Sequence, residues 1–315
     1  MIMKACGVSG PGADVVLLDL PEPPAPEAGQ LLLEVDAAGV GPWDQLLTDA
    51  SWDVGLRTPA ALGVEGAGRV VAVGPGVEGF SLGDRVLAHE APLPGGSGFW
   101  AERALITAAS AAPCPTELDA AQAAALPVAG LTAYQALEEL ALTSGQRLLI
   151  TNGGGATGAL ALQIAAARGI EVTVTASAAA GERLSALGAS EVVDYRKPGW
   201  RGQVPHGFDG VLIAVEGTSQ EAMSVLRDGG RLISLTSDAP AGERGIVSRD
   251  IYVRPDAAQL AHLAESAVAG RLQQNLEVLP SSEGPAAFAR VSAGQAGGRK
   301  IVLTWTQPRQ GAART

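Results

Sequence analysis

The stretch Leu148–Ala161, LLITNGGGATGALA, decides the fold of this chain. An apolar run leads into glycines and then into an Ala- and Leu-rich run, which is typical of a strand, a tight turn and a helix. The spacing G-x-G-x-x-G is met by Gly153, Gly155 and Gly158. We expect the first to permit the turn, the second to let a pyrophosphate approach the backbone, and the third to let the helix pack on the strand.

This turn therefore predicts a dinucleotide-binding site. The pyrophosphate would lie at the positive end of the helix, on free backbone amides, and the expected contacts include Ala156 and Thr157. The alternative is a glycine-rich connection without a ligand.

Strands and helices alternate on the carboxyl side of this turn. The pattern predicts strands at 147–151, 171–175, 191–195, 210–215 and 231–235, and helices at 158–168, 181–187 and 219–227. Such alternation predicts a doubly wound parallel sheet with helices on both faces. On the amino side, short strands at 30–40, 68–74 and 84–88 suggest a small barrel or rolled sheet. Two helical pieces across 117–142, interrupted at Pro127–Gly130, separate these regions, and a helix at 256–272 and a strand at 299–305 follow.

The residues after the second predicted strand indicate which dinucleotide binds. A reader of a ribose 2′-hydroxyl would be an acidic residue about 20 positions past the glycines, but the strand ends in Thr175, Ala176 and Ser177. Ser177, Arg183 and Tyr195 would instead form a cationic, hydroxyl-rich pocket for a 2′-phosphate. The cofactor is therefore predicted to be NADPH. The alternative is that Arg183 is an ordinary solvated charge.

Composition excludes several other classes of protein. The 315 residues suggest about two domains. The chain has 22 basic and 33 acidic residues and no Lys/Arg cluster, so nucleic acid is not an expected partner. Two cysteines and three histidines exclude a four-cysteine zinc site and a disulfide framework. No apolar stretch of about 20 residues occurs, so no membrane partner is expected and a cytoplasmic location is predicted.

Several segments together resemble one family. They are AAGVGPWD (37–44), LGVEGAGRVVAVGPGVEGFSLGDRV (62–86), ALPVAGLTAYQAL (125–137), LRDGGRLISL (226–235) and GRKIVL (298–303). With the glycine turn, they make the chain resemble the medium-chain dehydrogenase/reductase superfamily, in its zinc-free quinone oxidoreductase and enoyl reductase branch. The resemblance runs from about Met3 to Trp305.

The resemblance implies a split architecture. Residues 1–122 and 251–315 would form a GroES-like β-barrel domain, and residues 123–250 a Rossmann-like domain that binds NADP. The active site would lie in the cleft between them. A homodimer built through the nucleotide domains is also implied, with Ile246–Val253 as a candidate edge strand.

The resemblance also bears on metal binding. Zinc-dependent relatives carry Cys where Gly41 stands and His where Val64 stands, and their third ligand position falls near Val128. None of these side chains can bind a metal, so no metal is expected. The zinc-free branch usually has Asn at the position of Gly41, and its Arg and Tyr correspond roughly to Thr48 and Trp52. A tyrosine that acts as proton donor or carbonyl anchor is therefore missing at its expected place.

Further site candidates each have a structural alternative. The resemblance places Thr132 beside the nicotinamide, although it could be a helix cap. Candidate cofactor contacts at the ends of predicted strands are Ala214, Leu235 and Thr236, with strand-to-loop packing as the alternative. Candidate walls of an apolar substrate pocket are Trp43, Trp52 and Trp100, with interface packing as the alternative. Asp44 and His89 are pocket candidates too, but a structural hydrogen-bonding role is favoured for both.

These observations predict an NADPH-dependent, zinc-independent oxidoreductase. It would transfer hydride to an activated C=C bond, as in an enone or enoyl substrate, or to a quinone. The proton donor and the small apolar or conjugated carbonyl substrate stay open. One alternative is a tailoring enzyme with redox-neutral chemistry, such as a cyclase or isomerase, on the same fold. Another is a non-enzymatic NADPH-binding protein.

Overall fold

The structure is a computed structural model that describes residues 1–48, 51, 53–93 and 98–305, and it divides into two compact units. The first unit combines Met1–Val128, Pro255–Val268 and Leu276–Thr315, and the second combines Ala129–Arg254 and Ala269–Asn275. Residue 122, where a domain boundary was expected, lies inside the helix α2 (Ala120–Ala124), and the first segment of the first unit continues to Val128. The second expected boundary, at residue 250, falls at the end of the last strand of the second unit.

The second unit is built on a six-stranded sheet in which every neighbouring pair is parallel. Its strands are β9 (Arg147–Ile150), β10 (Glu171–Ala176), β11 (Glu191–Asp194), β12 (Phe208–Ile213), β13 (Leu226–Ser234) and β14 (Val247–Asp250). They lie in the order β11-β10-β9-β12-β13-β14, which is the 3-2-1-4-5-6 order of a doubly wound dinucleotide-binding sheet. The predicted Rossmann-like sheet is thereby confirmed, and its switch point lies between β9 and β12.

Four helices connect or accompany these strands: α3 (Pro127–Leu140), α4 (Ala156–Ala167), α5 (Gly181–Ala186) and α6 (Ser219–Val225). The β-branched and leucine side chains of β9, β12 and β13 are fully buried, which explains the nearly continuous apolar runs in the sequence. The two helical pieces expected across 117–142 are present, but the break between them lies at Ala125 and Leu126 and not at Pro127–Gly130. Proline is instead the first residue of α3, where its missing N–H costs no hydrogen bond.

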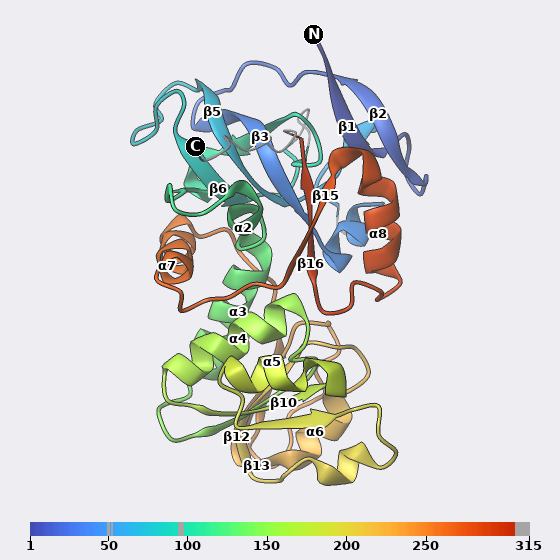
Figure 1. The fold of residues 1–315 in the computed structure, drawn as a ribbon, viewed down its shortest axis with the longest axis vertical. Helices are drawn as coiled ribbons and strands as arrows, with labels where there is room; N and C mark the ends of the chain where they lie inside the picture. Colours follow the sequence, from blue (N-terminus) through green and yellow to red (C-terminus); the bar gives the residue numbers. More distant parts are fainter. Residues whose placement is uncertain (49–50, 52, 94–97, 306–315) are drawn as a thin grey trace, which may run out of the picture. The chain divides into compact units, whose positions relative to one another are not determined.

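The first unit is a β structure assembled from segments far apart in the sequence (Figure 1). Its larger sheet has the order β15-β16-β3-β5-β6-β8, and β7 also pairs with β3. These strands are β3 (Gln30–Val40), β5 (Glu65–Val73), β6 (Arg85–His89), β7 (Arg103–Thr107), β8 (Ala111–Pro113), β15 (Leu276–Pro280) and β16 (Lys300–Thr304). The smaller sheet consists of β1 (Ile2–Val8), β2 (Val15–Pro21) and β4 (Ala60–Ala61). The helices α7 (Ala257–Val268) and α8 (Gly284–Ser292) complete the unit.

A buried ion pair connects two distant strands of the first unit. Lys300, at the start of β16, is 5% exposed, and its Nζ contacts the Glu65 carboxylate and donates to the Val40 carbonyl at 3.0 Å. The other oxygen of Glu65 accepts the Val128 amide at 2.8 Å, at the beginning of α3. Glu65 therefore joins β5, β16 and the first turn of α3, where a negative charge is favourable.

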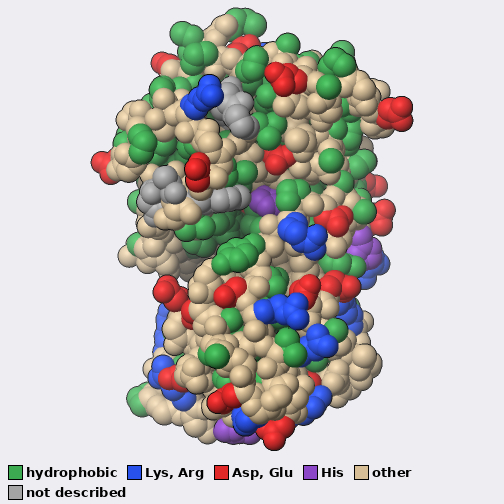
Figure 2. Space-filling view, turned by 180° about the vertical axis from the view of Figure 1, so that it is seen from behind, with side chains coloured by type: hydrophobic (Ala, Val, Ile, Leu, Met, Phe, Trp, Pro, Cys, Tyr) green, Lys and Arg blue, Asp and Glu red, His purple; other side chains and the backbone are tan. Residues whose placement is uncertain are grey.

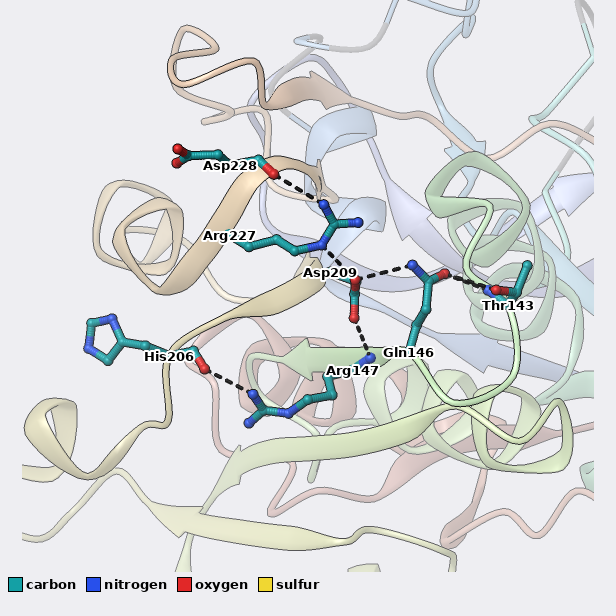
Figure 3. Close-up of polar contacts among 7 residues, drawn as sticks. All are labelled: Thr143, Gln146, Arg147, His206, Asp209, Arg227 and Asp228. Carbon is teal, nitrogen blue, oxygen red and sulfur yellow. Dashed lines mark hydrogen bonds and ion pairs between the residues drawn. The ribbon is translucent and has the colours of Figure 1, made fainter.

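At the amino-terminal edge of the second sheet, Asp209 joins three strands (Figure 3). Its carboxylate accepts the Arg147 amide at 2.8 Å, the Gln146 side chain at 3.1 Å and the Arg227 guanidinium at 2.6 Å. Burial alone would raise the pKa of Asp209, but these bonds outweigh it and hold the pKa below its usual value. The network lies at the end of the sheet opposite to the glycine turn.

Surface charge and helix length are the features that concern nucleic-acid and membrane partners. Figure 2 shows acidic and basic side chains interspersed on the visible face, without a large basic patch. In the described part of the chain, no helix combines the length and the apolar character needed to cross a bilayer.

Candidate functional site

The glycine turn connects β9 to α4 at the switch point of the second sheet. A Cβ atom added to Gly153 would lie 2.6 Å from Cβ of Val174, on the neighbouring strand β10. A Cβ atom added to Gly158 would lie 2.5 Å from the Asn152 carbonyl oxygen. Both distances are shorter than any ordinary contact, so these two glycines are required by the packing of the turn.

Gly155 differs from both. The nearest atoms to an added Cβ all belong to Asn152, the closest being its side-chain nitrogen at 3.0 Å. Gly155 is also the N-cap of α4 and provides no side chain to cap it. The amides of the first turn, including those of Ala156 and Thr157, are therefore left for an anion, which fits a pyrophosphate.

The expected 2′-phosphate readers gather at the carboxyl ends of β10 and β11. Ser177 directly follows β10 and Tyr195 directly follows β11, and the two strands are paired at Ala176 and Asp194. Arg183 on α5 donates from Nη2 to the Gly154 carbonyl at 3.0 Å, which places its guanidinium beside the glycine turn. Partial burial lowers the pKa of Arg183, although a guanidinium stays charged near neutral pH.

Hydrogen bonds link the ends of the central strands. Thr151 accepts the Ala214 amide at 2.9 Å through its hydroxyl, and the Asn152 side chain donates to the Ala214 carbonyl at 3.2 Å. Asn152 has a φ of 53°, a left-handed conformation that asparagine tolerates better than most residues. The predicted contact Ala214 is therefore tied to the glycine turn, and the sequence reasoning had not identified Asn152.

Asp238 is a second residue that the sequence reasoning missed. Its Oδ1 accepts the hydroxyls of Ser234 and Thr236, both at 2.8 Å, and its Oδ2 accepts the Gly217 amide at 3.0 Å. Burial alone would raise the pKa of Asp238, but the donors around the carboxylate outweigh it and lower the pKa to about 2. An acid shortly after an apolar strand, in LISLTSD, is the signal that could have identified it.

The predicted contacts Leu235 and Thr236 follow β13 at the same edge of the sheet. The Leu235 amide donates to the Ile213 carbonyl at 2.9 Å, so the two strand ends are aligned. Thr132 lies in the interior of α3 and is half-buried, so the alternative of a helix cap is wrong.

In the first unit, Trp43 and Asp44 form a short turn after β3. An added Cβ on Gly41 would lie 2.1 Å from Cε2 of Trp43, so the indole fills the space of a side chain at position 41. Asp44 is fully buried and accepts the Gly41 amide at 2.9 Å, in agreement with the favoured structural role.

The remaining pocket candidates of the first unit are mostly core residues. Trp100 is fully buried, donates from Nε1 to the Gly39 carbonyl at 2.9 Å and packs edge-on against Phe288, so the expectation of a pocket wall is wrong. His89 is 3% exposed and its Nδ1 lies 2.8 Å from the Val64 carbonyl oxygen, a structural arrangement. Trp52 lies outside the described residues.

Among the residues with described positions, no three His, Cys, Asp or Glu side chains are grouped in a way that could hold a metal ion.

Two family models match the chain. The model of the alcohol dehydrogenase GroES-like domain matches residues 27–116, and that of the zinc-binding dehydrogenase domain matches residues 187–303. The first match lies in the unit that contains β3 to β8. The second begins directly after α5 and ends in β16.

Named relatives and a solved structure agree with these matches. The chloroplast envelope quinone oxidoreductase homolog of Arabidopsis thaliana is 35% identical over 68% of this chain and 68% of its own length. The chloroplastic NADPH-dependent alkenal/one oxidoreductase of the same plant is 33% identical over 70% of this chain, but the match spans only 58% of that relative. The quinone oxidoreductase structure from Coxiella burnetii superposes with a TM-score of 0.88 at 26% identity, over 97% of this chain and 100% of that one.

Proposed function

We propose a function on the premise that this chain belongs to the medium-chain dehydrogenase/reductase superfamily, in its quinone oxidoreductase-like and enoyl reductase-like branch. The proposal is an NADPH-dependent oxidoreductase that reduces an activated C=C bond or a quinone by hydride transfer. The substrate would be a small conjugated carbonyl compound, by analogy with the relatives that are named for alkenals, alkenones and quinones.

The observation that carries the proposal is the open glycine turn with Arg183 beside it. The uncapped first turn of α4 would hold the pyrophosphate, and the bare backbone at Gly155 would let it approach. When bound, the dinucleotide supplies the hydride. The chain supplies the binding surface at the carboxyl ends of its strands, from Gly153 to Thr236.

The choice of NADPH depends on Ser177, Arg183 and Tyr195. The guanidinium, one hydroxyl after β10 and one after β11 suit a dianionic phosphate. No Asp or Glu stands at the end of β10 or among residues 177–181, so NADH would lack the acidic partner that usually accepts from its ribose 2′-hydroxyl.

The proposed reaction proceeds without a metal. The positions of the metal ligands in zinc-dependent relatives hold Gly41, Val64 and a residue near Val128, which lack donor atoms in their side chains. The indole of Trp43 also fills the space beside Gly41. Placement and hydrogen bonds would therefore have to stabilise the transition state.

Assembly and location are proposed as well. The edge strand β14 would join two copies into a homodimer, as the family resemblance implies. The two cysteines are free and buried, which suits a reducing cytoplasm, and cell fractionation would test this location.

The experiment is a titration of the protein with NADPH and with NADH, followed by protein fluorescence. We expect NADPH to bind at least tenfold more tightly. Arg183→Ala should weaken NADPH binding about tenfold and leave NADH binding nearly unchanged, because the lost partner is the 2′-phosphate. The matched control is Arg201→Ala, an exposed arginine paired with Glu221 in the same unit, which should bind like the wild type.

A turnover assay completes the test. Wild-type protein with a panel of enones and quinones should consume NADPH in proportion to reduced product. Product formation without loss of NADPH would favour redox-neutral chemistry, and failure to bind either dinucleotide would overturn the proposal.

A further inference from the structure

At the edge of the second sheet where its strands end, one side-chain carboxylate forms hydrogen bonds with two loops. Asp238 bonds the Gly217 amide in the loop after β12 and the hydroxyls of Ser234 and Thr236 at the end of β13. Ser234 is fully buried, so its hydroxyl depends on protein partners. Removal of Asp238 would leave the two loops without their shared acceptor.

The loop after β13 is also fixed on its other side. The Ala239 amide donates to Asp250 at 3.0 Å, and the hydroxyls of Ser237 and Tyr252 lie 3.1 Å apart. Ser237 has a φ of 60°, a conformation that costs free energy for a serine and persists only where its surroundings enforce it. The loop from 235 to 239 is therefore held in one conformation by contacts with β12 and β14.

The position of these loops connects them to one end of the dinucleotide. A sheet of this order consists of two mononucleotide-binding halves, and the ligand lies across the carboxyl ends of both. Ser177 and Arg183 belong to the first half, made by β9 to β11, and would bind the adenosine end. The loops after β12 and β13 belong to the second half and would face the nicotinamide end.

We propose that Asp238 is a positioning residue for the nicotinamide end, and that its fixed negative charge makes the protein bind the oxidised dinucleotide relatively more tightly than the reduced one. This inference rests on the proposed dinucleotide function. The reduced ring is neutral and the oxidised ring is a cation, so a nearby carboxylate attracts only the oxidised form. The hydrogen-bond donors around Asp238 hold its carboxylate ionised across the physiological pH range.

The test uses Asp238→Asn and three probes: NADPH, NADP⁺ and 2′-phospho-ADP-ribose, which lacks the nicotinamide. In the variant, the ratio of the Kd for NADP⁺ to the Kd for NADPH should rise about fivefold. Binding of 2′-phospho-ADP-ribose should change less than twofold. Isothermal titration calorimetry measures all three constants without turnover.

Two further variants separate charge from structure. Ser234→Ala removes one hydrogen bond but keeps the charge, so it should weaken NADPH and NADP⁺ equally and leave the ratio unchanged. Asp209→Asn breaks the network at the opposite end of the sheet and should lower the melting temperature without changing the ratio (Figure 3).

The outcomes are distinguishable. If wild-type protein binds none of the probes, the proposed function fails. If it binds them but Asp238→Asn leaves the ratio unchanged, or weakens 2′-phospho-ADP-ribose as much as NADP⁺, the inference about Asp238 is overturned while the function stands.

Discussion

At the scale of single residues, Asp44 is an unusual ionisable group. Its side chain is fully buried, and burial raises the pKa of Asp44 to about 7, against which the Gly41 amide and the charge of Lys300 act only in part. The folded protein thus binds this proton more tightly than the unfolded chain, whose aspartate has a pKa of 3.8. The resulting stability is complete below about pH 4 and is lost as the pH rises through about 7.

Asp44→Asn should remove this pH dependence, because asparagine keeps an acceptor for the Gly41 amide but does not ionise. Between pH 5 and pH 7, the wild type should lose about 2 kcal/mol more free energy of unfolding than the variant. Urea unfolding at pH 5, 6 and 7 measures both. If the free energy of unfolding changed equally with pH in the two proteins, Asp44 would ionise in the folded state as it does in water.

At the scale of elements, the glycine turn and α4 form a unit whose tolerance differs from position to position. An added Cβ at Gly158 meets the Asn152 carbonyl oxygen at 2.5 Å and the Gly153 Cα at 2.9 Å. At Gly154 the nearest atoms are the Cβ atoms of Ala176 and Ala180 at 3.7 Å, an ordinary contact. Sequence spacing ranks the glycines by motif position, whereas the structure ranks them by the space that each one has.

Gly158→Ala should therefore destabilise the second unit by about 1–3 kcal/mol, since α4 must move away from β9. Gly154→Ala is the matched control and should change the stability by less than about 0.5 kcal/mol. Thermal unfolding followed by circular dichroism compares them. Alanine favours a helix over glycine, so an unchanged or raised melting temperature for Gly158→Ala would contradict the packing argument.

The elements also show where sequence reasoning ends. The alternation after Gly153 predicted the parallel sheet, because apolar runs and turn signals are local. The start of β13 was missed: it begins at Leu226, where LRDGG suggests the end of a helix and a turn. The pairing of β12 with β13 jumps from Phe208–Leu226 to Gly210–Arg231, so β13 bulges over this segment. A bulge depends on the partner strand and leaves no local pattern.

The residues of the candidate site also differ in whether the sequence alone could identify them. Gly155, Ser177 and Arg183 could be proposed from the sequence because they lie within the glycine motif or at short sequence distances after it. Asn152 and Asp238 were missed because their partners, Ala214 and Gly217, lie on other strand ends. Trp100 was misjudged because its place in the chain does not reveal that Gly39 and Phe288 enclose it.

At the scale of the whole molecule, contacts between distant segments matter most. The pair of Glu65 and Lys300 joins residues 235 positions apart and thereby ties the final strand to the first half of the chain. Breaking one partner of such a buried pair is far more costly than replacing both. The local sequence predicts a closing strand at this place, and only the fold shows the partner that holds it there.

The edge strand β14 leads to a prediction about assembly. Its outer side carries backbone groups without a strand partner in the described structure, and Val247 is 40% exposed. An exposed edge of this kind is a template for pairing, and a two-fold axis would continue the sheet into a second copy.

Val247→Lys should convert the proposed dimer into monomers, because lysine on an edge strand opposes pairing. Val278→Lys is the matched control, since Val278 is 50% exposed on the edge strand β15 of the other unit, and it should leave the dimer intact. Sedimentation velocity over a range of protein concentrations measures the assembly. A wild-type monomer, or equal dissociation of both variants, would show that β14 does not form the interface.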